Sequence, residues 1–463
     1  MNKKILLSFI TFCLLWTAFA ASVSVVNGQT KKQIKQAKQL MGDGDRSFQK
    51  KDYRAAITKY AEAIVLVPNE PATHYWKGYA HYYLNEFDQA ITEMNAALDR
   101  GYKPLDVYKL RWFLNYQKKD YEAALNDVEK GLQLDPSNLT FNLAVGELNF
   151  AKGKYQQALV AYQKAVEIDP NNADAHYSIA ASYAAMGETD KQLLAALEAV
   201  TRNTKYLGEA YFLVGDGYQK TRKFNEAINA YLKAMSAKPD IYPLYHNLSD
   251  IYRNQNRFEE AITITKKGLE KFPNDGNLFI DLGWYNSLAD HNFESIIASK
   301  KAVELLPNQY MGYTNLCRAY YETKQYQLAL DSCNTALRLS PNDGESNVYL
   351  GFTYLSLSKE ETANKYFTKA VSGLIEFTKN NPDYLDGFYL LGNAYYYNGQ
   401  PTKAIEAYNK CLELSPRFAK ARYNLGLTYF VNKNMSAANE QYEELLKIDK
   451  DLAAKLKATL DKK

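Results

Sequence analysis

The sequence contains few of the residue types that define several classes of protein. Its 463 residues include only four cysteines, 13 prolines and 23 glycines, which excludes a collagen-like or low-complexity chain. The 56 lysine and arginine residues nearly balance the 52 aspartate and glutamate residues, so the clustered basic excess of nucleic-acid-binding proteins is absent. Hydrophobic residues make up 46% and charged residues 23%, a balance typical of a folded protein.

Catalytic and metal-binding motifs are missing as well. The chain has no phosphate-binding glycine loop, no HExxH helix, no GxSxG turn and no dinucleotide-binding GxGxxG. Among only five histidines, His74 and His81 are two helical turns apart, about 10.5 Å along a helix axis, which is too far to share a metal ion alone. We therefore expect a non-enzymatic protein with no catalytic residue, no cofactor and no metal site.

The N-terminus has the pattern of a secretory signal peptide. Lys3 and Lys4 precede an uncharged apolar stretch over residues 5–19, which ends in the small-residue pattern Ala18-Phe19-Ala20. We expect residues 1–28 to form the signal and its flank, with cleavage after residue 20 or 28 and export of the remainder to the periplasm or the extracellular space. Apolar character continues to residue 26, so an uncleaved membrane anchor remains an alternative.

A period of 34 residues runs through the rest of the chain. Prolines 136 and 170, then 239, 273, 307 and 341, and finally 382 and 416 are spaced by this interval, which indicates a repeat architecture. The frame predicts a lead-in at 29–36, twelve repeats over 37–452 and a polar capping helix over 453–463. The repeats start at residues 37, 71, 105, 139, 173, 208, 242, 276, 310, 344, 385 and 419.

Each repeat predicts a pair of antiparallel helices. Repeat positions 3–14 and 18–30 carry apolar or small residues at helical spacing, with a polar turn between them. Position 8 is glycine in eight repeats and position 20 is alanine in ten, so we expect small residues to face each other and the two backbones to approach closely. Larger residues at position 24 are then expected to fill the gap toward the next repeat.

Two repeats depart from the frame in length. Repeat 5 has 35 residues, lacks the terminal proline and carries Gln192 at position 20, so its junction with repeat 6 is predicted to be the weakest. Repeat 10 has seven extra residues before Pro382, which predicts a lengthened second helix. Both places are either flex points or tolerated insertions without a role.

The frame resembles the tetratricopeptide repeat (TPR) family, whose pattern is W-x2-L-G-x2-Y, A-x3-F and P. The seventh repeat carries this resemblance at Tyr245, Leu248, Ser249, Tyr252, Ala261, Thr265 and Pro273. The resemblance implies an all-α solenoid, a right-handed superhelix of about twelve helix pairs whose first helices line a concave groove.

Three cysteines remain beyond the predicted signal, and none forms a CxxC pair. Cys317, Cys333 and Cys411 fall at repeat positions 8, 24 and 27, which are inward positions of the frame. An oxidising compartment would allow Cys317 to pair with Cys333 within one repeat. We favour buried free thiols at all three positions.

The family resemblance places partner contacts at positions 2, 5, 6, 9, 12 and 13 of the first helices. Repeats 1–4, 11 and 12 present mainly aromatic residues there, such as Tyr75, Tyr79, Tyr82, Phe113 and Tyr396, which also suit packing between repeats. Repeats 6–9 present a polar strip with one large aromatic side chain, and we predict partner binding at this strip because aromatic and arginine residues dominate binding hot spots. The strip consists of Asp216, His246, Asn247, Asp250, Arg253, Asp281, Trp284, Asn315 and Arg318.

These observations predict an exported scaffold that binds a protein or peptide along its groove. Its expected role is the assembly or folding of cell-envelope or secreted proteins. Lys109 fills the first lysine place of the chaperone-tail carboxylate clamp, but Phe113 occupies the asparagine place after it, so recognition of such tails is not predicted. A glycan- or peptidoglycan-binding protein is the alternative, because tyrosine-rich grooves also stack on sugar faces. A solvated strip with no partner is the rival interpretation of the site.

Overall fold

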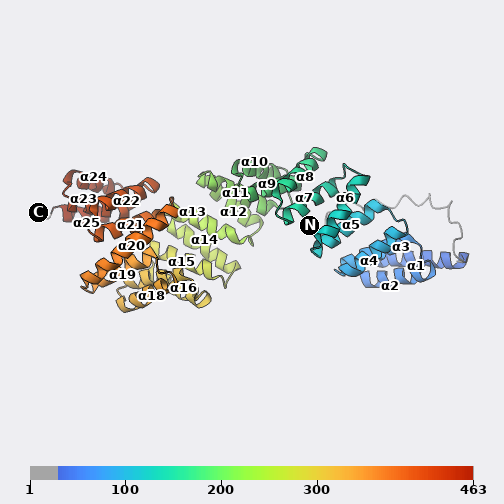
Figure 1. Cartoon of the computed structure of the whole chain (residues 1–463), viewed down its shortest axis with the longest axis horizontal. Coiled ribbons are helices and arrows are strands. Elements are labelled where there is room, and N and C mark those ends of the chain that lie inside the picture. Colours follow the sequence, from blue (N-terminus) through green and yellow to red (C-terminus); the bar gives the residue numbers. More distant parts are fainter. Residues whose placement is uncertain (1–29, 462–463) are drawn as a thin grey trace. The chain divides into compact units, whose positions relative to one another are not determined.

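The computed structural model describes residues 30–461, and every regular element of this part of the chain is an α-helix. The helices follow one another as twelve antiparallel pairs and a final single helix (Figure 1). The prediction of an all-α fold with about twelve helix-turn-helix repeats is confirmed. The predicted signal peptide lies outside the described residues.

The chain divides into two compact units, and the boundary falls between Lys205 and Tyr206. This is the junction of repeats 5 and 6, which the sequence predicted to be the weakest. Unit 1 contains α1 (Lys31–Gln49), α2 (Tyr53–Leu66), α3 (Pro71–Tyr83), α4 (Phe87–Asp99), α5 (Pro104–Gln117), α6 (Tyr121–Leu134), α7 (Leu139–Ala151), α8 (Tyr155–Ile168), α9 (Ala173–Met186) and α10 (Thr189–Thr201).

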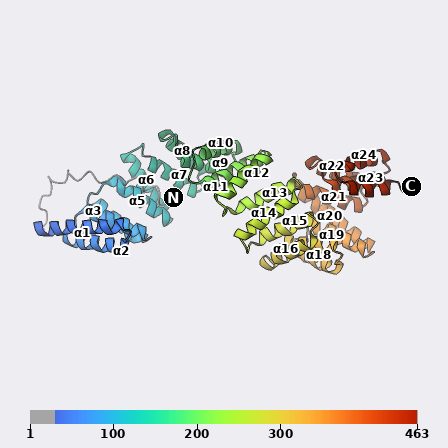
Figure 2. The same ribbon diagram turned by 180° about the vertical axis from the view of Figure 1, so that it is seen from behind.

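Unit 2 holds the remaining seven helix pairs and the last helix (Figure 2). Its helices are α11 (Leu207–Lys220), α12 (Phe224–Ala237), α13 (Tyr242–Asn254), α14 (Phe258–Lys271), α15 (Gly276–Leu288), α16 (Asn292–Leu305), α17 (Tyr310–Glu322), α18 (Tyr326–Leu339), α19 (Gly344–Ser356), α20 (Glu360–Asn380), α21 (Leu385–Tyr397), α22 (Pro401–Leu414), α23 (Ala419–Val431), α24 (Met435–Leu446) and α25 (Lys450–Leu460). Residues Ala453, Leu456 and Leu460 of α25 are buried against the preceding pair.

The first helix begins earlier than the repeat frame. Thr30 caps α1 by accepting a hydrogen bond from the backbone N–H of Gln33, whose side chain in turn accepts one from the backbone N–H of Thr30. This reciprocal capping box starts the helix at Lys31. Most of the lead-in predicted at 29–36 is therefore part of α1.

The turn inside every helix pair has the same backbone conformation. Repeat position 15 has a positive φ in all twelve pairs, between 57° and 63° at the nine non-glycine positions and between 72° and 76° at Gly153, Gly187 and Gly399. A left-handed residue after a helix C-terminus reverses the chain and pairs the last carbonyl groups of the helix. The shared turn fixes how the two helices of each pair meet.

The packing of repeat position 8 differs from the sequence prediction. A Cβ atom added at Gly44 would lie 2.6 Å from Cε1 of Tyr60, and one added at Gly392 would lie 2.4 Å from the same atom of Tyr408. These rings occupy position 24 of the same repeat, so position 24 packs on the glycine of its own pair. The predicted approach of positions 8 and 20 is seen in repeat 8, where Oγ of Ser295 donates a hydrogen bond to the backbone carbonyl of Gly283 at 2.7 Å. The sequence did not predict that the position-24 ring also packs on this glycine position, where it needs the space that a Cβ atom would fill.

Repeat 3 reverses the sizes at these two positions. Trp112 occupies position 8 and is 1% exposed, whereas Val128 occupies position 24. In both arrangements a large side chain at one of the two positions faces a smaller residue at the other, as close packing requires.

The same contact explains a disulfide that the sequence prediction did not favour. Cys317 and Cys333 occupy positions 8 and 24 of repeat 9, and they form a disulfide with their Cα atoms 5.1 Å apart. The prediction of free thiols at these two residues is wrong, since they occupy the same two positions that contact each other at Gly44 and at Gly392. The prediction is confirmed for Cys411, which is a free and buried cysteine.

Two glycines in α1 test this packing with opposite expected effects. Gly44→Ala should lower the free energy of unfolding by about 1–3 kcal/mol, because its Cβ would overlap the ring of Tyr60. Gly42→Ala, two residues away in the same helix, has open space around the added Cβ and should raise it by about 0.5–1 kcal/mol through helix propensity. Hydrogen exchange of α1 and α2 in the two variants measures both effects. Equal effects of the two substitutions would contradict the packing.

Candidate functional site

The predicted polar strip lies on α11, α13, α15 and α17 of unit 2, and several of its members hold the helices together. Asn247 donates a hydrogen bond to the hydroxyl of Tyr231 at 3.2 Å. Asn315 is 5% exposed and donates to the backbone carbonyl of Ile280 at 2.9 Å. Asp216 pairs with Lys220 one turn later on α11, at 2.7 Å. These contacts are made inside unit 2.

A histidine–carboxylate pair connects α13 and α15. Nδ1 of His246 lies 2.8 Å from Oδ2 of Asp281. This hydrogen bond raises the pKa of His246, with burial opposing it and the charge of Asp281 adding to it. Burial raises the pKa of Asp281, while the contact with His246 acts in the opposite direction. The pair is therefore strongest when the imidazole is protonated.

Arg253 forms the centre of a buried cluster. Its side chain is 3% exposed, and its Nη2 atom lies 2.5 Å from Oδ1 of Asp250. Nη1 lies 3.3 Å from Oδ2 of Asp386. The guanidinium stacks 4.5 Å from the ring centre of Trp284 and 4.9 Å from that of Tyr384. Burial opposes the charge, but the surrounding acidic and tyrosine side chains outweigh it and raise the pKa of Arg253.

A second buried arginine lies on α17. Arg318 is 5% exposed, forms an ion pair with Glu345 and lies over the ring of Tyr349 at 5.4 Å. Its Nε atom has no hydrogen-bond partner within the described part of the chain. Burial is the main cause that raises the pKa of Glu345, against the lowering effect of Arg318.

The sequence analysis missed the residues that complete the Arg253 cluster. Tyr384 and Asp386 come from the connection before α21 and from its first turn, and the ring of Tyr384 stacks on Trp284 with centroids 5.6 Å apart at 14°. Asp386 falls at position 2 of repeat 11, one of the positions searched, and its acidic character was the available signal. Its partner on repeat 7 is 133 residues away, and no sequence pattern shows that contact.

Unit 1 carries a different kind of surface, which we call the aromatic face. Rings from α1, α3 and α5 contact one another in a continuous series: Phe48 lies 6.1 Å from Trp76 and 5.9 Å from Tyr79, and Tyr82 lies 5.8 Å from Phe113. Trp76 is 37% exposed, whereas Tyr79 is buried. The members of the aromatic face are Phe48, Tyr75, Trp76, Tyr79, Tyr82, Tyr83 and Phe113.

The tyrosines of the aromatic face remain uncharged at neutral pH. Burial raises the pKa of Tyr75, Tyr79 and Tyr82 above the ordinary value. Tyr102, which stacks on Tyr75 at 4.4 Å, has its pKa raised to about 12 by burial and by Asp106. The face can therefore offer apolar ring surfaces and neutral hydroxyl groups to a ligand.

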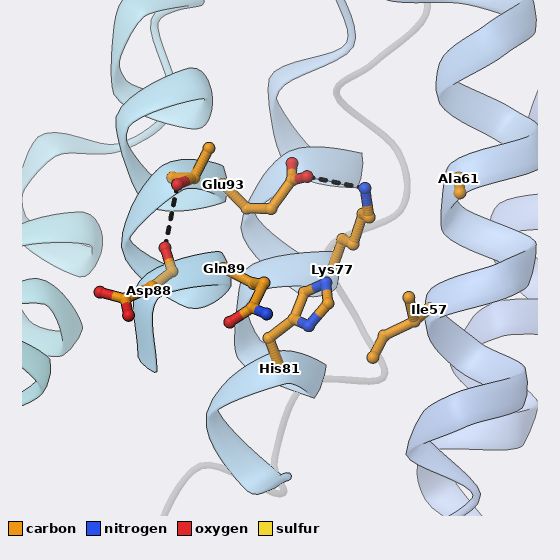
Figure 3. Close-up of a pocket in the computed structure, with 8 residues that line it drawn as sticks. Ile57, Ala61, Lys77, His81, Asp88, Gln89 and Glu93 are labelled. Atoms are coloured by element: carbon orange, nitrogen blue, oxygen red, sulfur yellow. Dashed lines mark hydrogen bonds and ion pairs between the residues drawn. The ribbon is translucent and has the colours of Figure 1, made fainter. Parts of the chain in front are cut away.

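A mixed-charge pocket of about 590 Å³ lies between α2, α3 and α4 (Figure 3). Lys77 reaches Glu93 at 2.7 Å, and His74 contacts the same carboxylate at 2.7 Å. Burial opposes the charge of Glu93, but these two contacts outweigh it and lower its pKa. His81 lies 2.7 Å from Glu86. Within residues 30–461, no group of three or more acidic, histidine or cysteine side chains could hold a metal ion.

Comparison with known proteins identifies the repeats. A TPR repeat model matches residues 44–85, 146–187 and 392–433. A second model, described as tetratricopeptide repeat, matches residues 208–241, 242–275 and 419–452. The matched segments, which lie in both compact units, therefore resemble the tetratricopeptide repeat.

Curated relatives are similar to this chain over a limited length. The chain is 30% identical to small glutamine-rich tetratricopeptide repeat-containing protein 2 of Mycosarcoma maydis over 107 residues, which are 23% of this chain and 30% of that protein. It is 29% identical to the Hsp70-Hsp90 organising protein of Plasmodium falciparum, over 24% of this chain and 22% of that protein. Similarity to the E3 ubiquitin-protein ligase CHIP of Arabidopsis thaliana is 28% and spans 35% of the ligase. The chain thus spans about a third or less of each of these relatives.

Two solved structures are similar to parts of this chain or to most of its length. The crystal structure of MamA is 27% identical and covers 34% of this chain and 92% of that chain, with a TM-score of 0.32. The structure of yeast Tom70 is 17% identical and covers 92% of this chain and 94% of that chain, with a TM-score of 0.40. Within residues 30–461, no helix has both the length and the apolar character needed to cross a membrane.

Proposed function

We propose that the protein is a non-enzymatic scaffold that binds an extended segment of another protein on the aromatic face of unit 1. The observation that carries this proposal is the exposure of Trp76 within a continuous series of aromatic rings. Aromatic side chains with little conformational freedom dominate protein-binding hot spots. Rings presented side by side suit the apolar side chains of an extended segment.

The predicted strip of unit 2 is a weaker candidate for the same role. Arg253, Asn315 and Arg318 are each no more than 5% exposed, and their polar groups contact residues of unit 2. A partner would have to separate those contacts before it could reach the side chains. The strip remains a hypothesis that substitution of Trp284 can test.

We further propose that the protein is exported and acts in the assembly or folding of envelope or secreted proteins. The basic and apolar pattern of residues 1–28 supports export. The disulfide between Cys317 and Cys333 adds support, because structural disulfides persist in oxidising compartments and are rare in the cytosol. The redox state of this pair in protein taken from its native host tests the location, and a reduced pair would contradict it.

The binding proposal predicts a loss of affinity on Trp76→Ala. Reduced, carboxymethylated α-lactalbumin is a suitable permanently unfolded probe, and its affinity should fall about 10- to 30-fold, which corresponds to roughly 1.4–2 kcal/mol. Val65→Ala is the control, since Val65 is 79% exposed in unit 1 but outside the aromatic face, and it should leave the affinity within about twofold. Fluorescence anisotropy measures both. Equal affinities for wild type and Trp76→Ala would contradict the proposal.

A glycan-binding role is the second candidate, and the stacked rings of Tyr75 and Tyr79 in the aromatic face are the observation that favours it. Soluble peptidoglycan fragments serve as the probe in the same assay. Binding of these fragments that is lost in Trp76→Ala, together with no binding of the unfolded polypeptide, would replace the protein-binding proposal by the glycan-binding one.

A further inference from the structure

We propose that the connection between α20 and α21 is a clasp that closes unit 2 on itself and covers part of the face formed by α13 and α15. The clasp consists of the connection at residues 381–384 together with Leu385 and Asp386, the first two residues of α21. In Figure 1 and Figure 2 the α20–α21 segment lies beside α13, and the hydrogen bond from Arg253 to Asp386 joins residues 133 positions apart. This inference concerns unit 2 and is independent of the binding role proposed for unit 1.

The centre of the clasp is a buried arginine between two aromatic rings. Arg253 of α13 lies between Trp284 of α15 and Tyr384 of the clasp, and Asp386 accepts a hydrogen bond from its Nη1 atom at 3.3 Å. Phe377 of α20 packs edge-on against Tyr384 at 5.1 Å. The clasp residues thus fill the space above Trp284.

Three further polar contacts, which we call the seam, join the same two parts of unit 2. Arg222 pairs with Asp383 at 2.6 Å, Asn256 donates to Ser415 Oγ at 2.8 Å, and Lys420 pairs with Asp290 at 2.9 Å. Arg222, Asn256 and Asp290 are the position-15 turn residues of repeats 6, 7 and 8. Their partners follow in the same order, before α21, after α22 and at the start of α23. Along the seam, the turns of repeats 6, 7 and 8 therefore meet the segment from α21 to α23 in chain order.

The seven extra residues of repeat 10 make the clasp. The helix α20 has 21 residues, whereas the second helices of the neighbouring repeats have 14. The predicted lengthening of this helix is confirmed. The two added turns extend the helix by roughly 10 Å. They contain Phe377 and bring the connection that follows the helix to Arg253. The insertion thus has a packing role.

The clasp should open as one unit. The ion pairs at its rim are well exposed, with side-chain exposures of 64% and 68% for Arg222 and Asp383, and each contributes little alone. The buried centre is different, because withdrawing Tyr384 and Asp386 would leave Arg253 with fewer partners for a desolvated charge. While the clasp is closed, Trp284 and Arg253 contact the chain itself. A partner of this face must therefore bind an open form.

Hydrogen exchange of the full chain tests the clasp, because it reports local opening segment by segment. Tyr384→Ala should speed exchange in α13, 130 residues away in sequence, by tenfold or more. Tyr354→Ala is the control, because Tyr354 also stacks on a tyrosine of unit 2, but this partner, Tyr366 at 5.4 Å, belongs to the same repeat. It should leave exchange in α13 unchanged. If the Tyr384→Ala variant exchanges in α13 at the wild-type rate, the proposal is overturned.

Tyr384→Ala could also unfold repeat 11, which would be seen as fast exchange in α22. A second variant tests the clasp without this effect. The double variant Arg222→Ala/Asp290→Ala removes two exposed rim contacts and leaves the core of repeat 11 intact. It should speed exchange both in α13 and in residues 381–386 by at least twofold. Wild-type exchange in these two segments of the double variant would overturn the clasp.

Discussion

Replacing Tyr408 with alanine should lower the free energy of unfolding of unit 2 by about 3–5 kcal/mol. Tyr408 is 1% exposed, and its ring fills the space above Gly392 that a Cβ atom would otherwise occupy. Removing a buried aromatic side chain loses its transfer free energy and leaves a cavity. Urea unfolding followed by circular dichroism measures the change.

Tyr408→Phe is the matched control for this effect. It keeps the ring on Gly392 and removes only the hydroxyl, which donates to Oδ1 of Asn393 at 2.7 Å. Asn393 keeps the hydrogen bond from Asn424, so the expected cost is about 0.5–1.5 kcal/mol. Similar losses in the two variants would show that the ring does not carry the packing between positions 8 and 24.

Removing the disulfide of repeat 9 should have the second largest effect. Cys317 and Cys333 are 16 residues apart, and closing a loop of about this size stabilises a protein by roughly 3 kcal/mol in the chain-entropy model. The double variant Cys317→Ala/Cys333→Ala should therefore unfold at a lower temperature than the oxidised wild type. A reducing agent should lower the Tm of the wild type and leave the Tm of the double variant unchanged.

Cys411→Ala is the control for the disulfide prediction, because Cys411 is a free buried thiol in the same unit. Its Tm should still fall when a reducing agent is added. A wild-type protein whose Tm does not respond to the reducing agent would contradict the pairing of Cys317 with Cys333.

The sequence predicted the helix pairs because the information is local and repeated. Glycine at position 8, alanine at position 20 and the proline at position 32 recur in phase, and the first helices from α3 onward begin within one residue of the expected repeat starts. The contact between position 8 and the position-24 side chain of the same repeat was not predicted, since helical spacing gives the inward side of a helix and not every partner that it meets. Gly44 contacts Tyr60 for the same reason that Cys317 pairs with Cys333, because each pair joins positions 8 and 24 of one repeat.

The candidate site was predictable only in part. Trp284 and Arg253 do lie together, and they fall at positions 9 and 12 of successive first helices, two of the positions searched for partner contacts. Their contacts with Tyr384 and Asp386 depend on how repeats 7 and 11 approach each other in space. That approach is the sum of small rotations between neighbouring repeats, and no residue pattern records it. In the aromatic face, the sequence predicted Tyr75, Tyr79, Tyr82 and Phe113 at partner-facing positions, but Trp76 at position 6 of repeat 2 was missed.

We propose that the binding surface lies on the aromatic face of unit 1, whereas the strip of unit 2 is covered by its own chain. The most direct test compares Trp76→Ala with Trp284→Ala for binding of reduced, carboxymethylated α-lactalbumin, with both variants checked for helical content. The account predicts a 10- to 30-fold loss for Trp76→Ala and a change within about twofold for Trp284→Ala. A large loss for Trp284→Ala with none for Trp76→Ala would contradict it.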